Sequence, residues 1–358
     1  MPSLKEIKGR INSISSTLAI TSAMKMVAAA KLKKAQMAIQ NMLPYERRLH
    51  SMLIDLMGAM NISAAASEDG SVRGSGSAER GFDQSGDRLS LSNRHDLAGM
   101  DGAYSLMAQR EVRKVAIVAF ASNSSLCGAF NSNVIREATA VINEYRASGL
   151  GDADITVYSV GRKMAEAMKK LGFPSPADFT KMSDSPSYDA ASALAQELLD
   201  GFVSGRFDKV ELVYNHYKST SSQPTIRQTY LPLSLADATA DLQAGKIADS
   251  ASESDTNRGA EPVGAPVVRQ GSPTTEDLIV EPSKEELIAT LLPKVVRLRV
   301  FTTLLDSTAA EQAARTVAMQ LATDNGNDLL QELTLEYNKG RQQKITSEIL
   351  DLVGGSMQ

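Results

Sequence analysis

The stretch that decides the fold runs from Leu4 to Met42 and reads LKEIKGRINSISSTLAITSAMKMVAAAKLKKAQMAIQNM. Alternating steps of three and four residues from Leu4 meet mostly apolar side chains for about five heptads. These positions are Leu4, Ile7, Ile11, Ile14, Leu18, Thr21, Lys25, Ala28, Leu32, Ala35, Ile39 and Met42. A helix from Leu4 to Met60 would be roughly 85 Å long, which no small domain can bury alone. The stretch therefore predicts one helix of a coiled coil, whose stability Thr21 and Lys25 lower because they are polar.

A second long helix is predicted toward the other end of the chain. Its apolar positions recur at Leu287, Leu291, Leu298, Phe301, Leu305, Met319, Ala322, Leu329 and Leu333, and continue toward Ile349. The pattern breaks between Thr308 and Arg315, where the seam positions are polar and the window 309–314 is mostly small residues. In the first helix we expect Pro44 to produce a kink or to start a fresh helix. The two helices can pair antiparallel if a folded domain between them returns the chain to its starting point.

The middle of the chain alternates short apolar runs with helical segments. The predicted strands are 115–120, 155–160, 210–214 and 225–231, and the predicted helices are 131–146, 162–171 and 188–203. This alternation is typical of parallel strands joined by crossover helices, and the last two strands could form a hairpin at one edge. The middle therefore predicts a Rossmann-like α/β domain.

Two segments do not show a folded pattern. Between residues 67 and 86 half of the side chains are Gly or Ser, and 248–276 is similarly polar. The fold class expected is α/β, with an antiparallel coiled coil of the N- and C-terminal helices beside the Rossmann-like domain. The expected parts are an N-terminal shaft helix 1–62, a flexible insertion 63–110, the α/β domain 111–240, a flexible insertion 241–276 and a C-terminal shaft helix 277–358.

Residues able to perform chemistry are scarce. The three histidines, His50, His95 and His216, do not have metal-ligand spacing with one another or with Cys127. Cys127 has no local base and is best interpreted as a buried structural thiol. The loop 121–130 lacks the glycines and lysine of a phosphate-binding loop. We therefore expect no catalytic residue, cofactor or metal.

The charge of the chain is unevenly distributed. The whole chain carries −4, which argues against a polybasic nucleic-acid binder, whereas residues 1–48 contain nine basic and two acidic side chains, a net +7. This excess could be a solvated helix face, a weak nucleic-acid site, or a basic helix that meets acidic protein loops. A single cysteine, no secretory leader and no apolar stretch of 18 residues favour a cytosolic chain without a membrane span.

Several longer motifs resemble one family, the gamma subunits of bacterial F-type ATP synthases. The matching stretches are Pro2-Ser-Leu-Lys-Glu-Ile-Lys-Gly-Arg-Ile, Ile20-Thr-Ser-Ala-Met-Lys-Met-Val-Ala-Ala-Ala-Lys, Leu126-Cys-Gly-Ala-Phe-Asn, Tyr214-Asn, Glu311-Gln-Ala-Ala-Arg, Ala322-Thr-Asp-Asn-Gly, Glu332-Leu-Thr-Leu-Glu-Tyr-Asn-Lys-Gly-Arg-Gln, Ile345-Thr-Ser-Glu-Ile and Val353-Gly-Gly. They cover both ends and the middle of the chain. The two polar segments near 67–100 and 240–275 depart from the family's minimal length.

The resemblance implies a non-catalytic rotor that couples proton flow to ATP synthesis and regulates ATPase activity. Its partners would be the alpha and beta subunits, the epsilon subunit and the membrane c-ring, on the cytoplasmic face of a bacterial inner membrane, with no nucleic acid. It also implies six contacts with a beta subunit: Met24, Lys25, Arg315, Arg341, Gln342 and Thr346. The first two would face a mobile acidic loop of beta, and the last three a catch loop.

Two other classes of protein remain open from the residues alone. A coiled-coil adaptor of another complex predicts a homodimer formed through the same seam, whereas a rotor predicts pairing of both ends within one chain. A Rossmann-type enzyme ranks third, because it would need a nucleotide site that the loop 121–130 does not resemble.

Overall fold

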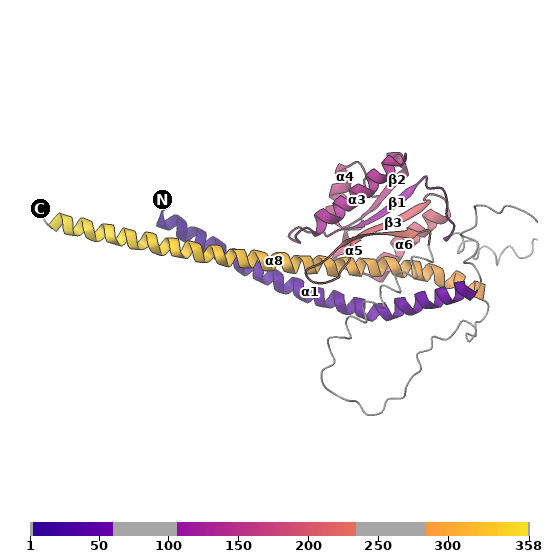
Figure 1. The fold of residues 1–358 in the computed structure, drawn as a ribbon, viewed down its shortest axis with the longest axis horizontal. Coiled ribbons are helices and arrows are strands. Elements are labelled where there is room, and N and C mark those ends of the chain that lie inside the picture. The colour runs from indigo at the N-terminus through magenta and orange to yellow at the C-terminus, as the bar shows by residue number, and fades with distance from the viewer. Residues whose placement is uncertain (1–2, 60–105, 234–283, 357–358) are drawn as a thin grey trace, which may run out of the picture.

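The computed structural model describes residues 3–59, 106–233 and 284–356. Two long helices, α1 (Leu4–Ala59) and α8 (Lys284–Ser356), lie side by side, and an α/β domain packs against them near one end (Figure 1). We call the helix pair the shaft. The predicted boundaries at residues 62, 240 and 276, and nearly all of both predicted insertions, lie outside the described residues.

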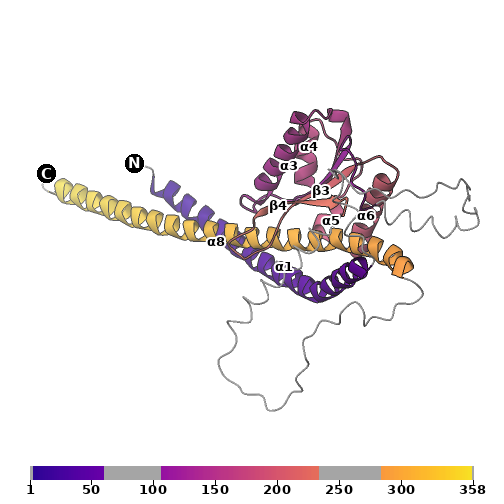
Figure 2. The ribbon, with the colours of Figure 1, turned by 45° about the vertical axis from the view of Figure 1, so that its right-hand side comes forward.

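The two shaft helices run antiparallel, as the sequence predicts. Their outer ends lie at the same end of the molecule, where α8 extends beyond the start of α1 (Figure 1). All the seam positions predicted between Leu4 and Met42 are buried or half-buried, so the heptad pattern identifies the packed face of α1. The helix continues through Pro44 rather than ending there, and Figure 2 shows α1 curving along the domain.

The predicted seam of α8 is only partly right in its outer half, where Leu333 is buried as predicted. Ala322, Leu329 and Ile349 are exposed, and the half-buried positions are instead Thr323, Gly326 and Leu330. The reason is that the packed face there mixes leucines with small and polar residues, while several large apolar residues lie on the outer face. Apolar periodicity alone therefore misplaced these three positions of the helix.

The predicted break in α8 is the most deeply buried part of that helix. Ala309, Ala310 and Ala313 are fully buried, and Gln312 and Arg315 are less than a tenth exposed. Here α8 runs between α1 and the domain, so it is covered on two sides (Figure 2). Small side chains allow both neighbours to approach closely.

The domain contains one mixed sheet in the order β2-β1-β3-β4. Its strands are β1 (Val115–Phe120), β2 (Ile155–Val160), β3 (Lys209–Asn215) and β4 (Thr225–Leu231). β1 pairs parallel with β2 and β3, and β4 is the antiparallel edge strand, which confirms the predicted crossovers and hairpin. The helices are α3 (Phe130–Ala147), α4 (Arg162–Lys170), α5 (Thr180–Asp184) and α6 (Tyr188–Val203), with a 3₁₀ turn, η3, at Asp152–Asp154. The sequence predicted three of these helices and missed the short α5.

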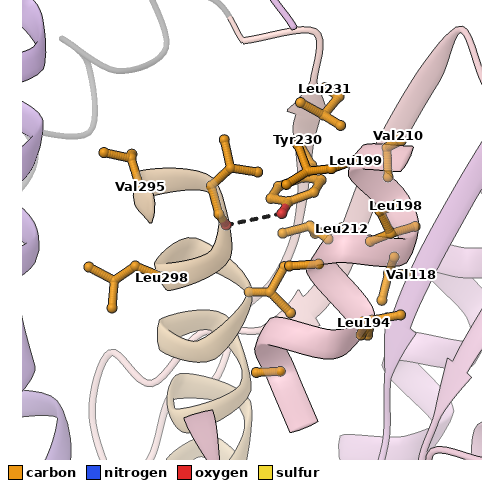
Figure 3. Packing of buried hydrophobic residues seen from close by; sticks show 14 of the residues in the cluster. Val118, Leu194, Leu198, Leu199, Val210, Leu212, Tyr230, Leu231, Val295 and Leu298 are labelled. Carbon is orange, nitrogen blue, oxygen red and sulfur yellow. Dashed lines mark hydrogen bonds between the residues drawn. The ribbon is translucent and has the colours of Figure 1, made fainter. Parts of the chain in front are cut away.

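Alternate residues of β1 serve two separate cores. Val115, Ile117 and Ala119 point toward α3 and α4, whereas Ala116, Val118 and Phe120 join the cluster that includes α6 and the inner parts of both shaft helices. Figure 3 shows this second core at Tyr230, whose hydroxyl donates to the Val296 carbonyl oxygen at 3.0 Å. The domain is therefore built directly onto the shaft.

Candidate functional site

The shaft is the most exposed feature of the fold. Its two helices, α1 and α8, pair in the same register along its outer part. A Cβ atom on Gly326 would lie 2.6 Å from Leu18 Cδ2, and one on Gly340 would lie 3.1 Å from Leu4 Cδ2. Fourteen residues, two heptads, separate these contacts on both helices. On the domain side of the Leu18 contact, the Thr323 hydroxyl donates to the Thr21 hydroxyl at 3.2 Å. The glycines let the backbones approach closely, which makes the outer shaft thin and continuously paired.

Nearer the domain, two small clusters cover two different faces of α8. Ala309 and Ala313 pack against Leu32 and Ala35 of α1, whereas Ala310 and Ala314 pack against Cys127 and Phe130 of the domain. One further side chain, that of Tyr217, packs against both clusters. Tyr217 therefore lies where α1, α8 and the β3–β4 hairpin meet.

Polar contacts join the same hairpin to both shaft helices. Asp306 of α8 accepts a hydrogen bond from the Tyr217 backbone N–H at 2.8 Å and lies 2.6 Å from His216 Nδ1. The Gln36 amide of α1 donates to the Tyr217 hydroxyl at 2.7 Å. The hydrogen bond with Asp306 raises the pKa of His216, although partial burial opposes the shift. The hairpin is thus held by two neighbouring residues, 216 and 217.

A cavity of about 470 Å³ opens beside this joint, between α1, α8 and the β3–β4 hairpin. Two buried residues, His50 and Arg299, are part of its lining. Burial, with the nearby Arg299 charge, lowers the pKa of His50 to about 4. The His50 imidazole is therefore neutral near pH 7.

A further polar contact between α8 and the domain involves Arg315. Its guanidinium donates to the Ser125 carbonyl oxygen at 2.9 Å and to the Glu311 carboxylate one helical turn away. Burial raises the pKa of Glu311, and the attraction of Arg315 only partly opposes this. Arg315 is 8% exposed, so the structure places this predicted partner contact inside the protein.

The other five predicted contact residues lie along the shaft in two places. Met24 and Lys25 are half-buried on α1, and Lys25 occupies a seam position. Arg341, Gln342 and Thr346 lie on the outer part of α8, where every residue from 341 to 350 is exposed. The structure does not bring these two groups together, and both are accessible from outside the shaft.

The carboxyl ends of β1 and β2, where α/β sheets commonly bind ligands, are filled by the chain itself. Asn123 Oδ1 accepts from the Arg162 backbone N–H at 2.8 Å, and Lys163 N–H donates to the Ser122 carbonyl at 3.1 Å. A Cβ on Gly161 would lie 2.0 Å from the Ala121 carbonyl oxygen. The first N–H groups of α4 therefore have protein partners in place of a phosphate.

The described residues define which side chains lie close enough to share a metal ion, and they also define the environment of Cys127. No three His, Cys, Asp or Glu side chains within residues 3–59, 106–233 and 284–356 cluster as a metal would require. Cys127 is buried, as the sequence predicted, at 3.2 Å from the Asn131 amide nitrogen. None of the helices in these same ranges combines the length and the apolar character needed to cross a bilayer.

These features define a class of protein: a mechanical subunit with a long intramolecular coiled coil fixed to a small α/β domain. The family model described as ATP synthase matches residues 3–357. The ATP synthase gamma chain of Phocaeicola vulgatus is 46% identical over 357 residues, and that of Bacteroides thetaiotaomicron is 45% identical over 358, each with complete coverage of both chains. The chain belongs to the ATP synthase gamma-chain family, whose members are non-catalytic subunits of the central-stalk rotor.

A solved structure shares the fold at much lower sequence identity. The matching chain comes from the mitochondrial ATP synthase of Euglena gracilis, in the OSCP, F1 and c-ring assembly. It has a TM-score of 0.51 and 19% identity, over 99% of this chain and 93% of that chain. Long paired terminal helices beside a small mixed sheet are therefore the fold of this family.

Proposed function

We propose that proton flow through a membrane c-ring turns this chain inside a ring of alpha and beta subunits, and that the turning shaft drives ATP synthesis and regulates ATP hydrolysis. The domain end of the shaft binds the c-ring and an epsilon subunit, and the outer end enters the alpha–beta ring. The complex lies at the cytoplasmic face of a bacterial inner membrane.

The observation that carries this proposal is the outer end of α8. Gly340 of α8 packs against Leu4, at the start of α1. Beyond Gly340, α8 continues as a single exposed helix. It carries large apolar side chains that are about half or more exposed: Ile345, Ile349, Leu350, Leu352 and Val353. Exposed apolar residues concentrated on one segment are typical of a surface that a partner covers. An axle end seated in a ring of partner subunits fits this arrangement.

The predicted beta contacts divide by their position on the shaft. Lys25 lies on the strongly basic α1, where an acidic loop of beta would be attracted without a deep, permanent contact. Arg341, Gln342 and Thr346 lie on the free end of α8, where a second loop of beta could reach them. The contact of Arg315 with beta stays a prediction, and its position gives it an internal role between α8 and the domain.

A charge reversal tests the contact of Lys25. We expect Lys25→Glu to lower ATP synthesis in the reconstituted complex by about fivefold, because apposing like charges costs on the order of 1 kcal/mol or more. The matched control is Lys170→Glu, which makes the same change at an exposed lysine on α4 of the domain. Unchanged synthesis with Lys25→Glu, in a complex that assembles normally, would show that this charge does not contact beta.

A further inference from the structure

The β3–β4 hairpin contacts both shaft helices through one side chain. The Tyr217 ring packs against the α1–α8 cluster around Leu32 and Ala309, and also against the α8–domain cluster around Cys127 and Ala310. The Tyr217 backbone N–H is bound to α8 through Asp306, and its hydroxyl is bound to α1 through Gln36. Among the residues that line these two clusters, Tyr217 alone belongs to both.

We propose that Tyr217, held by Asp306 and Gln36, is the positioning residue that transmits torque from the domain to both shaft helices. We call these three residues the clamp. This inference rests on the proposed function, because torque enters the chain at the domain only if the domain is attached to a rotating ring.

Farther along the shaft, the core around Leu49 and Leu53 already joins the domain to α1. At the joint, domain contacts with α8 alone would load only one helix, and without Tyr217 a force on α8 there would reach α1 through the helix–helix seam. At the joint this seam is made by Ala309 and Ala313 of α8 against Leu32 and Ala35 of α1, and the alanines interlock less deeply than large side chains would. A domain residue that contacts both helices loads them together, so that they turn as one body.

The hydrogen bonds make this contact directional. The Asp306 carboxylate accepts from two neighbouring residues of the hairpin, His216 and Tyr217, which prevents the hairpin from sliding along α8. The Gln36 amide donates to the Tyr217 hydroxyl at 2.7 Å, which gives the domain a polar link to α1 at this joint. Loss of the Tyr217 ring would remove packing from both alanine clusters.

The test measures the torsional stiffness of the rotor in a single assembled complex. The alpha–beta ring is fixed to a surface, and a bead is attached through Lys170→Cys on the exposed surface of α4; the native Cys127 is buried and will not react. In a stalled complex, we expect Tyr217→Ala to raise the angular variance of the bead about twofold, because close-packed interiors transmit strain and cavities do not. Tyr217→Phe, which keeps the ring, should give a smaller increase.

The matched control is Tyr188→Ala. Tyr188 is a half-exposed tyrosine of the domain whose ring meets Phe301 of α8 at 5.7 Å, on a different part of the helix. This change should leave the variance at the wild-type value. Gln36→Leu should match Tyr217→Phe, and the two changes combined should add nothing further, because both remove the same hydrogen bond.

The outcomes separate this inference from the proposed function. If the wild-type complex does not rotate when ATP is supplied, the proposed function fails. If it rotates but Tyr217→Ala and Tyr217→Phe both keep the wild-type variance, only the clamp is wrong. If Tyr217→Ala does not assemble, an increase with Tyr217→Phe supports the clamp and an unchanged variance overturns it.

Discussion

Asp306 and His216 form an ion pair whose strength depends on pH. The pKa of His216 is raised from its ordinary value of 6.5, chiefly by the hydrogen bond with Asp306. A group whose folded pKa is raised contributes its full stability below the unfolded value and loses that contribution as the pH rises through the folded value. We therefore expect the thermal unfolding midpoint of the isolated chain to fall as the pH rises above about 6.5, the ordinary pKa of histidine.

The control for this pH dependence is Asp306→Asn, which keeps an oxygen that can accept from the Tyr217 N–H. Its unfolding midpoint should be lower at pH 6 and should change less up to pH 8.5. Other charged groups near His216 are Lys218 on the hairpin and Glu46, Arg47 and Arg299 on the shaft. His50, the other histidine beside this joint, is already neutral because its pKa is lowered to about 4. If the unfolding midpoint changed with pH equally in the wild-type chain and in Asp306→Asn, the pH dependence would not come from the His216–Asp306 pair.

Ser159 of β2 is a second residue whose substitution should change the stability of the fold. Its hydroxyl is fully buried and has no hydrogen-bond partner among the described residues, and the side chain is 1% exposed. A buried unpaired hydroxyl costs free energy, whereas a methyl group at the same place does not. We expect Ser159→Ala to raise the free energy of unfolding in urea by about 1 kcal/mol. The control, Ser132→Ala on the exposed surface of α3, should change the free energy of unfolding by far less. A loss of stability with Ser159→Ala would show that the Ser159 hydroxyl has a hydrogen-bond partner.

At the scale of elements, the buried window of α8 should tolerate no increase in volume. Ala310 is fully buried between α8 and the domain, so Ala310→Leu should lower the free energy of unfolding by about 1–3 kcal/mol through overpacking. Ala322→Leu makes the same change at an exposed position of the same helix and should be nearly neutral. Urea unfolding of both variants measures the difference, and equal effects would show that the domain does not constrain α8 at this window.

Elements with a strong local period were predictable from the sequence, and contacts between elements were not. The strands Ile155–Val160 and Thr225–Leu231 were predicted at their observed bounds, because apolar runs and alternation are local signals. The helix Thr180–Asp184 is too short to show a period. The outer seam of α8 was predicted correctly at Leu333 but misassigned around Gly326, which takes a seam position that an apolar pattern reserves for large residues. The contact of His216 with Asp306, ninety positions apart, has no spacing that could reveal it.

At the scale of the whole molecule, the shaft varies in thickness along its length. Beside the domain α8 is enclosed on two sides, along the middle it is paired with α1 through small residues, and beyond Gly340 it is a single exposed helix. Torsional resistance should therefore fall from the domain toward the free end. The proposed axle end is the part of the chain that depends most on partner subunits for its burial.

If α1 and α8 turn as one body, a covalent link between them should not stop rotation. Leu18 and Gly326 are in close contact, so Leu18→Cys with Gly326→Cys should form an intramolecular disulfide on oxidation, without interference from the buried Cys127. We expect ATP-driven rotation in the assembled complex to continue at close to the reduced rate, since the link joins two parts of one rigid rotor. The control, Leu18→Ser with Gly326→Ser, reproduces the change in volume and cannot form the bond. If oxidation arrested only the cysteine variant, relative sliding of the two helices would be part of each turn, and the shaft could not act as a single body.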